Sequence, residues 1–261
     1  MLLLVDAGNT RIKWAIARDG AAPGDWSAHG AVLHGELARL APAWAGHGIR
    51  RALVANVAGP ALATELEGLL PVAPAWFTPR AELAGMRNRY RNPGQLGADR
   101  FAAALGARLL APGKALVVAT CGTATTVDAV SADGDFLGGM ILPGLGMMLS
   151  ALARGTAQLP LADAEKGAEK GPDKGPDKGP DTSAPAFADN TVDAIRAGCL
   201  AAQAGAIERA CAALPADLCI VSGGAAAHVA PLLSVPALLR DNIVLAGLHA
   251  AAPLVLAAGS E

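Results

Sequence analysis

The sequence predicts an α/β protein made of two similar halves, each with its own sheet and with a cleft between them. One observation is that strand-like and helix-like stretches alternate along the 261 residues. The other is that a strand–turn–strand unit at residues 1–18 recurs in the same layout at residues 115–131. A repeated unit of this kind is typical of an internal duplication.

The first unit has the pattern of a β-hairpin. Residues 1–5 (MLLLV) form a continuous apolar run, and residues 11–18 (RIKWAIAR) alternate between polar and apolar side chains. Gly8 and Asn9 lie between these runs and have the backbone freedom that a tight turn needs. A Rossmann or P-loop glycine turn would lead into a helix instead, so neither motif is indicated.

The second unit repeats this order. Residues 115–120 (ALVVAT) are apolar, residues 121–124 (CGTA) form the turn, and residues 125–131 (TTVDAVS) alternate. Gly8 and Gly122 are 114 residues apart, as are the Asp-Gly turn signals that follow each of them. We infer a duplication with domains at 1–114 and 115–261, although two common hairpins could coincide by chance.

The remaining stretches complete two α/β halves. Helices are expected at 61–70 and 97–110, and in the second of these Phe101, Leu105 and Leu109 share one face. After the second hairpin the sequence predicts these further elements: a strand at the start of residues 136–154, a turn at 143–144, a helix from about Met147, a helix over 192–214, and a short buried strand over 219–221.

Residues 165–182 differ from the rest because they repeat a K-G-P-D unit and contain almost no apolar side chains. We therefore expect a solvated, flexible insertion over residues 165–184 of the second domain. A specific docking tail is the alternative.

Composition excludes several function classes. Hydrophobic residues make up 52% and charged residues 17%, which argues against a disordered chain. Aromatic residues make up only 3%, so platforms for stacking nucleic-acid bases are scarce. The net charge of −2 lacks the basic footprint of a non-specific DNA binder. A small anionic or neutral ligand is favoured, and no nucleic acid is expected.

Targeting and metal signals are also weak. The cysteines have no CxxC spacing and no neighbouring histidine cluster, so we expect buried reduced thiols and no structural zinc. Residues 1–5 are followed by Asp6 and lack a basic region, so no signal peptide is expected. The apolar tail at 243–259 contains His249 and Pro253 and is too short to span a membrane. The sequence thus predicts a cytoplasmic protein.

The two glycine turns are candidates for phosphate binding. Each follows a buried strand, so backbone N–H groups from both halves could contact one polyphosphate, assisted by the hydroxyls of the turn threonines Thr10, Thr123, Thr125 and Thr126. Asp6 would suit magnesium or its bound waters, and Lys13 would offset phosphate charge. The alternative is a pair of ordinary hairpins with a capping aspartate.

Residues 90–100 (YRNPGQLGADR) form a turn-rich stretch that leads into the predicted helix. In its first turn Asp99 could accept a proton from a substrate hydroxyl, while Arg100 could grip a carboxylate. Such positioning is what phosphoryl transfer demands. Asp99 could instead be a plain helix-start residue that favours the helix dipole. Neither a nucleophile elbow nor a P-loop is present, so covalent catalysis is not favoured.

Together these motifs resemble the type III pantothenate kinases. The matching segments are DAGNTRIKWA (6–15), NPGQLGADR (92–100), GTATTVD (122–128), GGMILPG (138–144), DNTVDAIRAG (189–198) and VSGGAA (221–226). The resemblance implies two duplicated ribonuclease-H-like domains of the actin-like ATPase superfamily and a homodimer. It also implies transfer of the ATP γ-phosphate to the terminal hydroxyl of pantothenate, the first step of coenzyme A biosynthesis.

The resemblance also implies roles for particular residues. Asp99 would be the general base, and Asp6 would lie near Mg²⁺, directly or through water. The nucleotide would be held by Asp6, Ala7, Gly8, Asn9, Thr10, Arg11, Lys13, Gly122, Thr123, Gly223 and Gly224. The pantothenate site, completed in the family by the partner subunit, would comprise Tyr90, Gly97, Ala98, Asp99, Arg100 and Thr191.

One position departs from the family pattern. Many members have an aspartate that binds K⁺ or NH₄⁺ at the position of Thr120, which is also the counterpart of Asp6 in the repeat. A neutral hydroxyl is a weaker cation ligand, which puts monovalent cation dependence in doubt for this chain. Two other functions remain open: an ATP-binding regulator, and a kinase for another acceptor such as a sugar.

Overall fold

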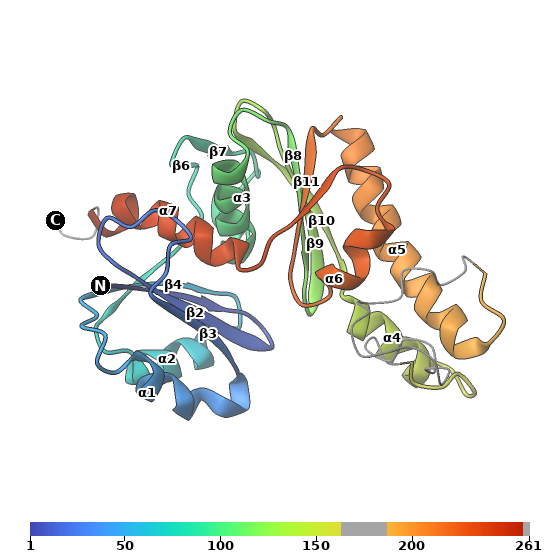
Figure 1. Cartoon of the computed structure of the whole chain (residues 1–261), viewed down its shortest axis with the longest axis horizontal. Coiled ribbons are helices and arrows are strands. Elements are labelled where there is room, and N and C mark those ends of the chain that lie inside the picture. The colour runs from blue at the N-terminus through green and yellow to red at the C-terminus, as the bar shows by residue number, and fades with distance from the viewer. Residues whose placement is uncertain (163–186, 258–261) are drawn as a thin grey trace. The chain divides into compact units, whose positions relative to one another are not determined.

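A computed structural model describes residues 1–162 and 187–257 (Figure 1). The chain divides into two compact units. The first comprises Met1–Lys114, Val130–Gly138 and the segment from Asn242 onward, and the second comprises Ala115–Ala129 and Gly139–Asp241. The domain boundary at 114/115 stays a prediction, and the predicted insertion at 165–184 lies outside the described residues.

The first unit contains a mixed sheet in the order β3-β2-β1-β4-β5. Its strands are β1 (Leu2–Ala7), β2 (Arg11–Ala17), β3 (Ala28–Leu33), β4 (Arg51–Asn56) and β5 (Pro74–Trp76). Strand β1 is antiparallel to β2 and parallel to β4. The predicted hairpin at residues 1–18 is therefore confirmed, and it occupies the centre of this sheet.

Helices cover both faces of this sheet, which explains why residues 2–5 of β1 are a continuous apolar run. The elements outside the sheet are η1 (His34–Arg39), α1 (Leu40–Trp44), α2 (Pro60–Leu69), β6 (Glu82–Leu83), β7 (Met86–Asn88), η2 (Pro93–Gln95), α3 (Ala98–Leu110) and α7 (Ile243–Ala257). Helices α1 and α2 lie on one face, and α7 lies on the other and contacts β1, β4 and β2 (Figure 1).

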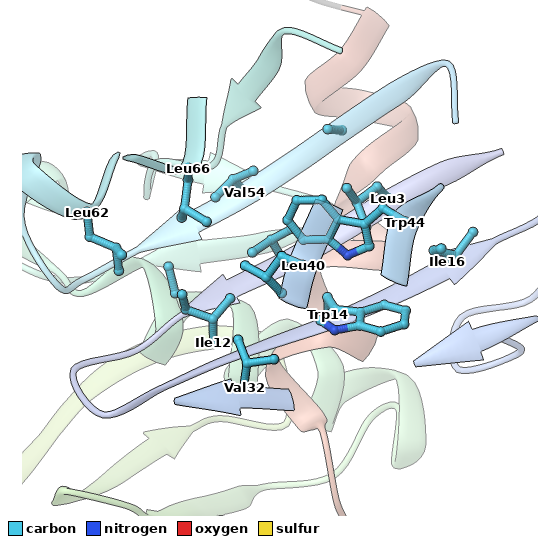
Figure 2. Packing of buried hydrophobic residues seen from close by; sticks show 13 residues of the cluster. Leu3, Ile12, Trp14, Ile16, Val32, Leu40, Trp44, Val54, Leu62 and Leu66 are labelled. Carbon is cyan, nitrogen blue, oxygen red and sulfur yellow. The ribbon is translucent and has the colours of Figure 1, made fainter. Parts of the chain in front are cut away.

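The core under α1 and α2 is a cluster of large apolar side chains (Figure 2). Leu3 and Val54 of the sheet meet Leu40 and Trp44 of α1 and Leu66 of α2. Each fully buried side chain of this size contributes about 1.5–3 kcal/mol relative to its exposed state. This packing fixes the sheet whose central hairpin carries Asp6.

The second unit is built around strands in the order β12-β11-β8-β9-β10. Its elements are β8 (Leu116–Cys121), β9 (Ala124–Val130), β10 (Asp135–Pro143), α4 (Leu145–Gly155), α5 (Thr191–Ala213), β11 (Leu218–Ser222), α6 (Ala226–Val229), η3 (Ala230–Leu232) and β12 (Ala237–Leu239). The end of β9 and residues 135–138 of β10 belong to the first unit. Strand β11 is parallel to both β8 and β12.

The two predicted hairpins share details of burial. Strands β1 and β8 are each six residues long, and in both only the fifth residue, Asp6 or Thr120, is partly exposed. The turns differ by one residue, because Gly8 N donates to Arg11 O whereas Gly122 N donates to Ala124 O. The second turn is thus the tighter of the two.

Most predicted elements are confirmed, and two details are corrected. Leu109 is 47% exposed, because residues four apart on an α-helix drift by about 40° per step and Leu109 has left the buried face of Phe101. Helix α4 begins at Leu145, two residues earlier than predicted, directly after the extended Gly144. All four cysteines are buried, as predicted. In the described part of the chain, no helix has the length and apolar character needed to cross a membrane.

Candidate active site

The β1–β2 turn places a carboxylate opposite an ammonium group. Asp6 is at the fifth position of β1, and its partner in the strand register is Lys13 on β2. Across the turn, Gly8 N donates to Arg11 O at 3.2 Å. The side chains of Asn9, Thr10 and Arg11 are exposed at the tip, and Ala7 is buried beneath it.

A histidine that the sequence did not single out supports this turn. His34 Nε2 lies 2.8 Å from Gly8 O, so this ring nitrogen donates to the carbonyl. His34 is half-buried at the start of η1. The contact joins residues 26 positions apart, and no local sequence signal indicates it.

Asp6 is in an environment that opposes its negative charge. Its pKa is raised from 3.8 to about 7, because desolvation, the largest cause, and the nearby Asp99 carboxylate together outweigh the lowering effect of Lys13. A half-buried carboxylate with a second carboxylate nearby fits a divalent cation. Mg²⁺ in particular binds through one or two carboxylates, substrate phosphates and water. Among the described residues, no three His, Cys, Asp or Glu side chains form a cluster that could hold a metal ion.

Asp99 is fixed in the first turn of α3. Its Oδ1 accepts a hydrogen bond from Arg100 N at 2.8 Å. A Cβ at Gly97 would lie 2.7 Å from this oxygen, so only glycine leaves room for the carboxylate in this position. Burial raises the pKa of Asp99, whereas the hydrogen bond from Arg100 N lowers it. A fixed carboxylate with raised basicity is suited to accept a proton.

Arg100 and Tyr90 form one unit beside Asp99. Arg100 is only 6% exposed, and its NH1 donates to Tyr90 Oη at 2.7 Å. The loop that carries Tyr90 is held by the side chain of Asn88, whose Oδ1 accepts from Tyr90 N and whose Nδ2 donates to Pro93 O. The structure therefore brings together Tyr90 and the helix-start residues 97–100, and it adds Asn88, which sequence reasoning missed.

In the second unit, the predicted glycines follow strands β8 and β11. Gly223 has a φ of +98°, and a Cβ there would lie 2.4 Å from Cys121 O, so the backbone approaches too closely for any larger residue. A Cβ at Gly144 would lie 2.4 Å from Thr123 O. Gly144 thus supports the turn that contains Gly122 and Thr123, and its signal in the sequence is the GGMILPG segment.

The other predicted site residues of the second unit do not lie in the turn between β8 and β9. Thr125 and Thr126 are buried on β9, so their hydroxyls are not at the surface of the turn. Thr120 pairs with Ser222 in the strand register and is partly exposed. Thr191 is the exposed first residue of α5, which is capped by Asn190 Oδ1 accepting from Asp193 N. Gly224 is exposed beside Gly223.

Comparison with solved structures shows the fold. A protein from Campylobacter jejuni, described as a conserved putative Baf family transcriptional activator, has a TM-score of 0.61 and 18% identity, and the alignment covers 98% of each chain. The activator of the 2-hydroxyisocaproyl-CoA dehydratase from Clostridium difficile has a TM-score of 0.55 and 13% identity, covering 98% of this chain and 94% of that one. The chain therefore has an α/β fold with two mixed sheets, which it shares with these solved structures.

Comparison of sequences shows the family. Residues 2–213 match the type III pantothenate kinases. The chain is also 54% identical to the type III pantothenate kinase of Janthinobacterium sp. (strain Marseille), over 97% of each protein. With the site geometry above, these matches establish that the chain belongs to the type III pantothenate kinases, the ATP-dependent enzymes that phosphorylate pantothenate in coenzyme A biosynthesis.

Proposed function

We propose that the protein transfers the γ-phosphoryl group of ATP directly to the terminal hydroxyl of pantothenate, with Asp99 as the general base. The hydroxyl oxygen bonds to the γ-phosphorus, the bond from phosphorus to the ADP oxygen breaks, and Asp99 takes the hydroxyl proton. The observation that carries this proposal is the fixed, half-buried carboxylate of Asp99 with its raised pKa.

Arg100 and Tyr90 bind pantothenate in this proposal. Pantothenate carries a carboxylate, and a guanidinium group suits such an anion in charge and geometry. The hydrogen bond between Arg100 NH1 and Tyr90 Oη limits the motion of both side chains before the substrate binds. Ala98 and Gly97 complete this part of the site, and Thr191 is assigned to it by family resemblance.

Asp6 and Lys13 act on the nucleotide side. Asp6 is proposed to hold Mg²⁺, directly or through water, and Lys13 to offset phosphate charge. When bound, Mg²⁺ would neutralise charge that develops on the phosphate oxygens. Residues 7–11, together with Gly122, Thr123, Gly223 and Gly224, are assigned to ATP by family resemblance. A homodimer is proposed on the same basis. We expect little dependence on K⁺ or NH₄⁺, because Thr120 offers a neutral hydroxyl where many family members have an aspartate.

The test measures ADP release from the purified protein with Mg-ATP, with and without pantothenate. We expect pantothenate-dependent release, and similar rates in sodium and potassium buffers because Thr120 replaces the cation-binding aspartate. Asp99→Asn should lower kcat by at least about 100-fold while leaving ATP binding intact, since general-base catalysis contributes about 10²–10⁴-fold. Near-normal turnover by Asp99→Asn would exclude the role of that carboxylate.

A further inference from the structure

The guanidinium group of Arg100 lies against two aromatic rings in the first unit. Its Cζ is 5.6 Å from the ring centroid of Tyr90 and 5.9 Å from that of Phe136. Both distances are within the range of a cation–π interaction, which strengthens when the cation is removed from water. Only 6% of the Arg100 surface is exposed, so its guanidinium group is largely removed from water.

The side chain of Phe136 has no polar atom, and the residue belongs to no motif assigned above to ATP or pantothenate. Its side chain is fully buried, 5.8 Å from the Tyr90 ring and edge-on to Phe101 at 6.5 Å. Two aromatic neighbours therefore fix the plane of the ring, and one of them is the residue that also hydrogen-bonds Arg100.

The backbone on either side of Phe136 is held just as firmly. Phe136 O accepts a hydrogen bond from Arg89 N at 3.0 Å, which ties β10 to the end of β7. The neighbouring carboxylate of Asp135 accepts from Arg87 Nε at 2.5 Å and from Arg89 NH2 at 3.0 Å. The strand that carries Phe136 and the segment that leads to Tyr90 are thus joined as one support.

We propose that Phe136 is a positioning residue for pantothenate binding, whose ring lies beside that of Tyr90 and helps to hold the Arg100 guanidinium in place. The inference rests on the proposed function, in which Arg100 binds pantothenate. An arginine side chain has several rotatable bonds, and ordering it during binding costs affinity. The two rings order it beforehand, so their effect belongs to pantothenate binding and not to the phosphoryl transfer step.

Phe136→Leu removes this ring while keeping an apolar side chain, and Phe77→Leu is the matched control. Phe77 is 2% exposed and stacks on Phe101 at 6.2 Å, so both variants lose a buried ring from the same aromatic row. Steady-state kinetics would give kcat and the KM of each substrate. Calorimetry would give the Kd of pantothenate independently of turnover.

For Phe136→Leu we expect the pantothenate KM and Kd to rise about tenfold, which corresponds to about 1.4 kcal/mol. The kcat and the KM for ATP should stay within about twofold of wild type, because a change confined to substrate binding raises KM alone. Phe77→Leu should leave the pantothenate KM and Kd unchanged. If Phe136→Leu does not fold, Phe136→Met fills a similar space without a ring and serves in its place.

Equal pantothenate KM and Kd values in the two leucine variants would overturn the positioning role. A loss of kcat alone in Phe136→Leu would overturn it as well. Absence of pantothenate turnover in the wild-type protein would instead contradict the proposed function, so the two failures are distinguishable.

Discussion

Asp6 is a residue whose charged form lowers folding stability, because its carboxylate is buried. Its pKa in the folded protein is about 7, against an ordinary value of 3.8, chiefly because burial disfavours the charged form. The folded state therefore binds a proton more tightly than the unfolded state does. It follows that the contribution of Asp6 to stability is fully present below pH 4 and is lost as the pH rises towards 7.

Asp6→Asn should consequently stabilise the protein at pH 8 in the absence of Mg²⁺ and nucleotide. We expect the Tm to rise by about 3 °C or more, which corresponds to about 1 kcal/mol in a chain of this size. The difference from wild type should shrink towards pH 4, and kinase activity should be lost. Thermal unfolding followed by circular dichroism at several pH values measures this.

Asp19 provides a control of opposite sign. Hydrogen bonds from Arg51 and Arg50 lower its pKa from 3.8 to about 2, so its contribution is present above pH 4 and is lost as the pH falls towards 2. Asp19→Asn should lower the Tm slightly at pH 8. If Asp6→Asn also lowers the Tm at pH 8, the assignment of a destabilising buried charge is wrong.

At the scale of elements, the β1–β2 hairpin depends on a contact from outside itself. The hydrogen bond from His34 Nε2 to Gly8 O fixes the orientation of the peptide that begins the turn. If this turn binds ATP phosphates as proposed, His34→Ala should raise the KM for ATP about fivefold, which is the effect of one hydrogen bond of about 1 kcal/mol. The KM for pantothenate should not change.

His34→Gln keeps a side-chain N–H donor and should recover most of the affinity for ATP. His29→Ala is the matched control, because His29 is an exposed histidine on β3 of the same unit. An unchanged KM for ATP in His34→Ala would show that the turn does not need this hydrogen bond.

The packing of α3 against α7 also affects the candidate site, because α3 carries Asp99 and Arg100 in its first turn. The helices approach closely through Gly106 and Gly247. A Cβ at Gly247 would lie 1.7 Å from Ala102 O, and one at Gly106 would lie 2.4 Å from Ile243 O. These atoms belong to rigid helical backbone, so neither glycine can be replaced without separating the helices.

Gly247→Ala should therefore lower the free energy of unfolding by about 3 kcal/mol, at the upper end of ordinary overpacking. Gly205→Ala is the control. Gly205 lies exposed within α5 with open space around it, so alanine there should raise stability by about 0.5–1 kcal/mol. Urea denaturation measures both changes. Equal stability of Gly247→Ala and wild type would contradict the close helix contact.

At the scale of the whole molecule, local pattern predicted the hairpins and the helix that carries Asp99. The apolar run of β1, the alternation in β2, and the turn-rich stretch before α3 are each contained in about ten residues. Helix α7 was not predicted as a helix, because it is apolar on most sides, contains Pro253 and resembles a generic buried run.

The candidate site likewise combines residues that the sequence indicates with contacts that only the structure shows. Asp6, Gly97, Asp99 and Arg100 lie in short motifs that the sequence displays directly. The contacts of His34 with Gly8 and of Phe136 with Arg100 join residues 26 and 36 positions apart. Such contacts depend on how strands and helices pack, and neither periodicity nor turn chemistry specifies them.

The proposed homodimer requires a surface on each chain that the partner can cover. Ile141 at the end of β10 is 65% exposed, and Met147 on the following α4 is 48% exposed. Large apolar side chains that are exposed on one chain are candidates for burial at an interface. For the proposed homodimer, the Ile141→Lys/Met147→Lys double variant should sediment at the monomer mass of 26.0 kDa, where the wild type sediments at twice that value.

The double variant should also lose turnover if, as the family resemblance implies, the partner subunit completes the pantothenate site. Leu239→Lys on β12 is the control, since Leu239 is 48% exposed at the edge of the sheet and should alter neither property. Analytical ultracentrifugation and the ADP-release assay would be run on the same samples. A monomeric double variant with full pantothenate turnover would show that each chain contains a complete site, because no residue from a partner would then be needed.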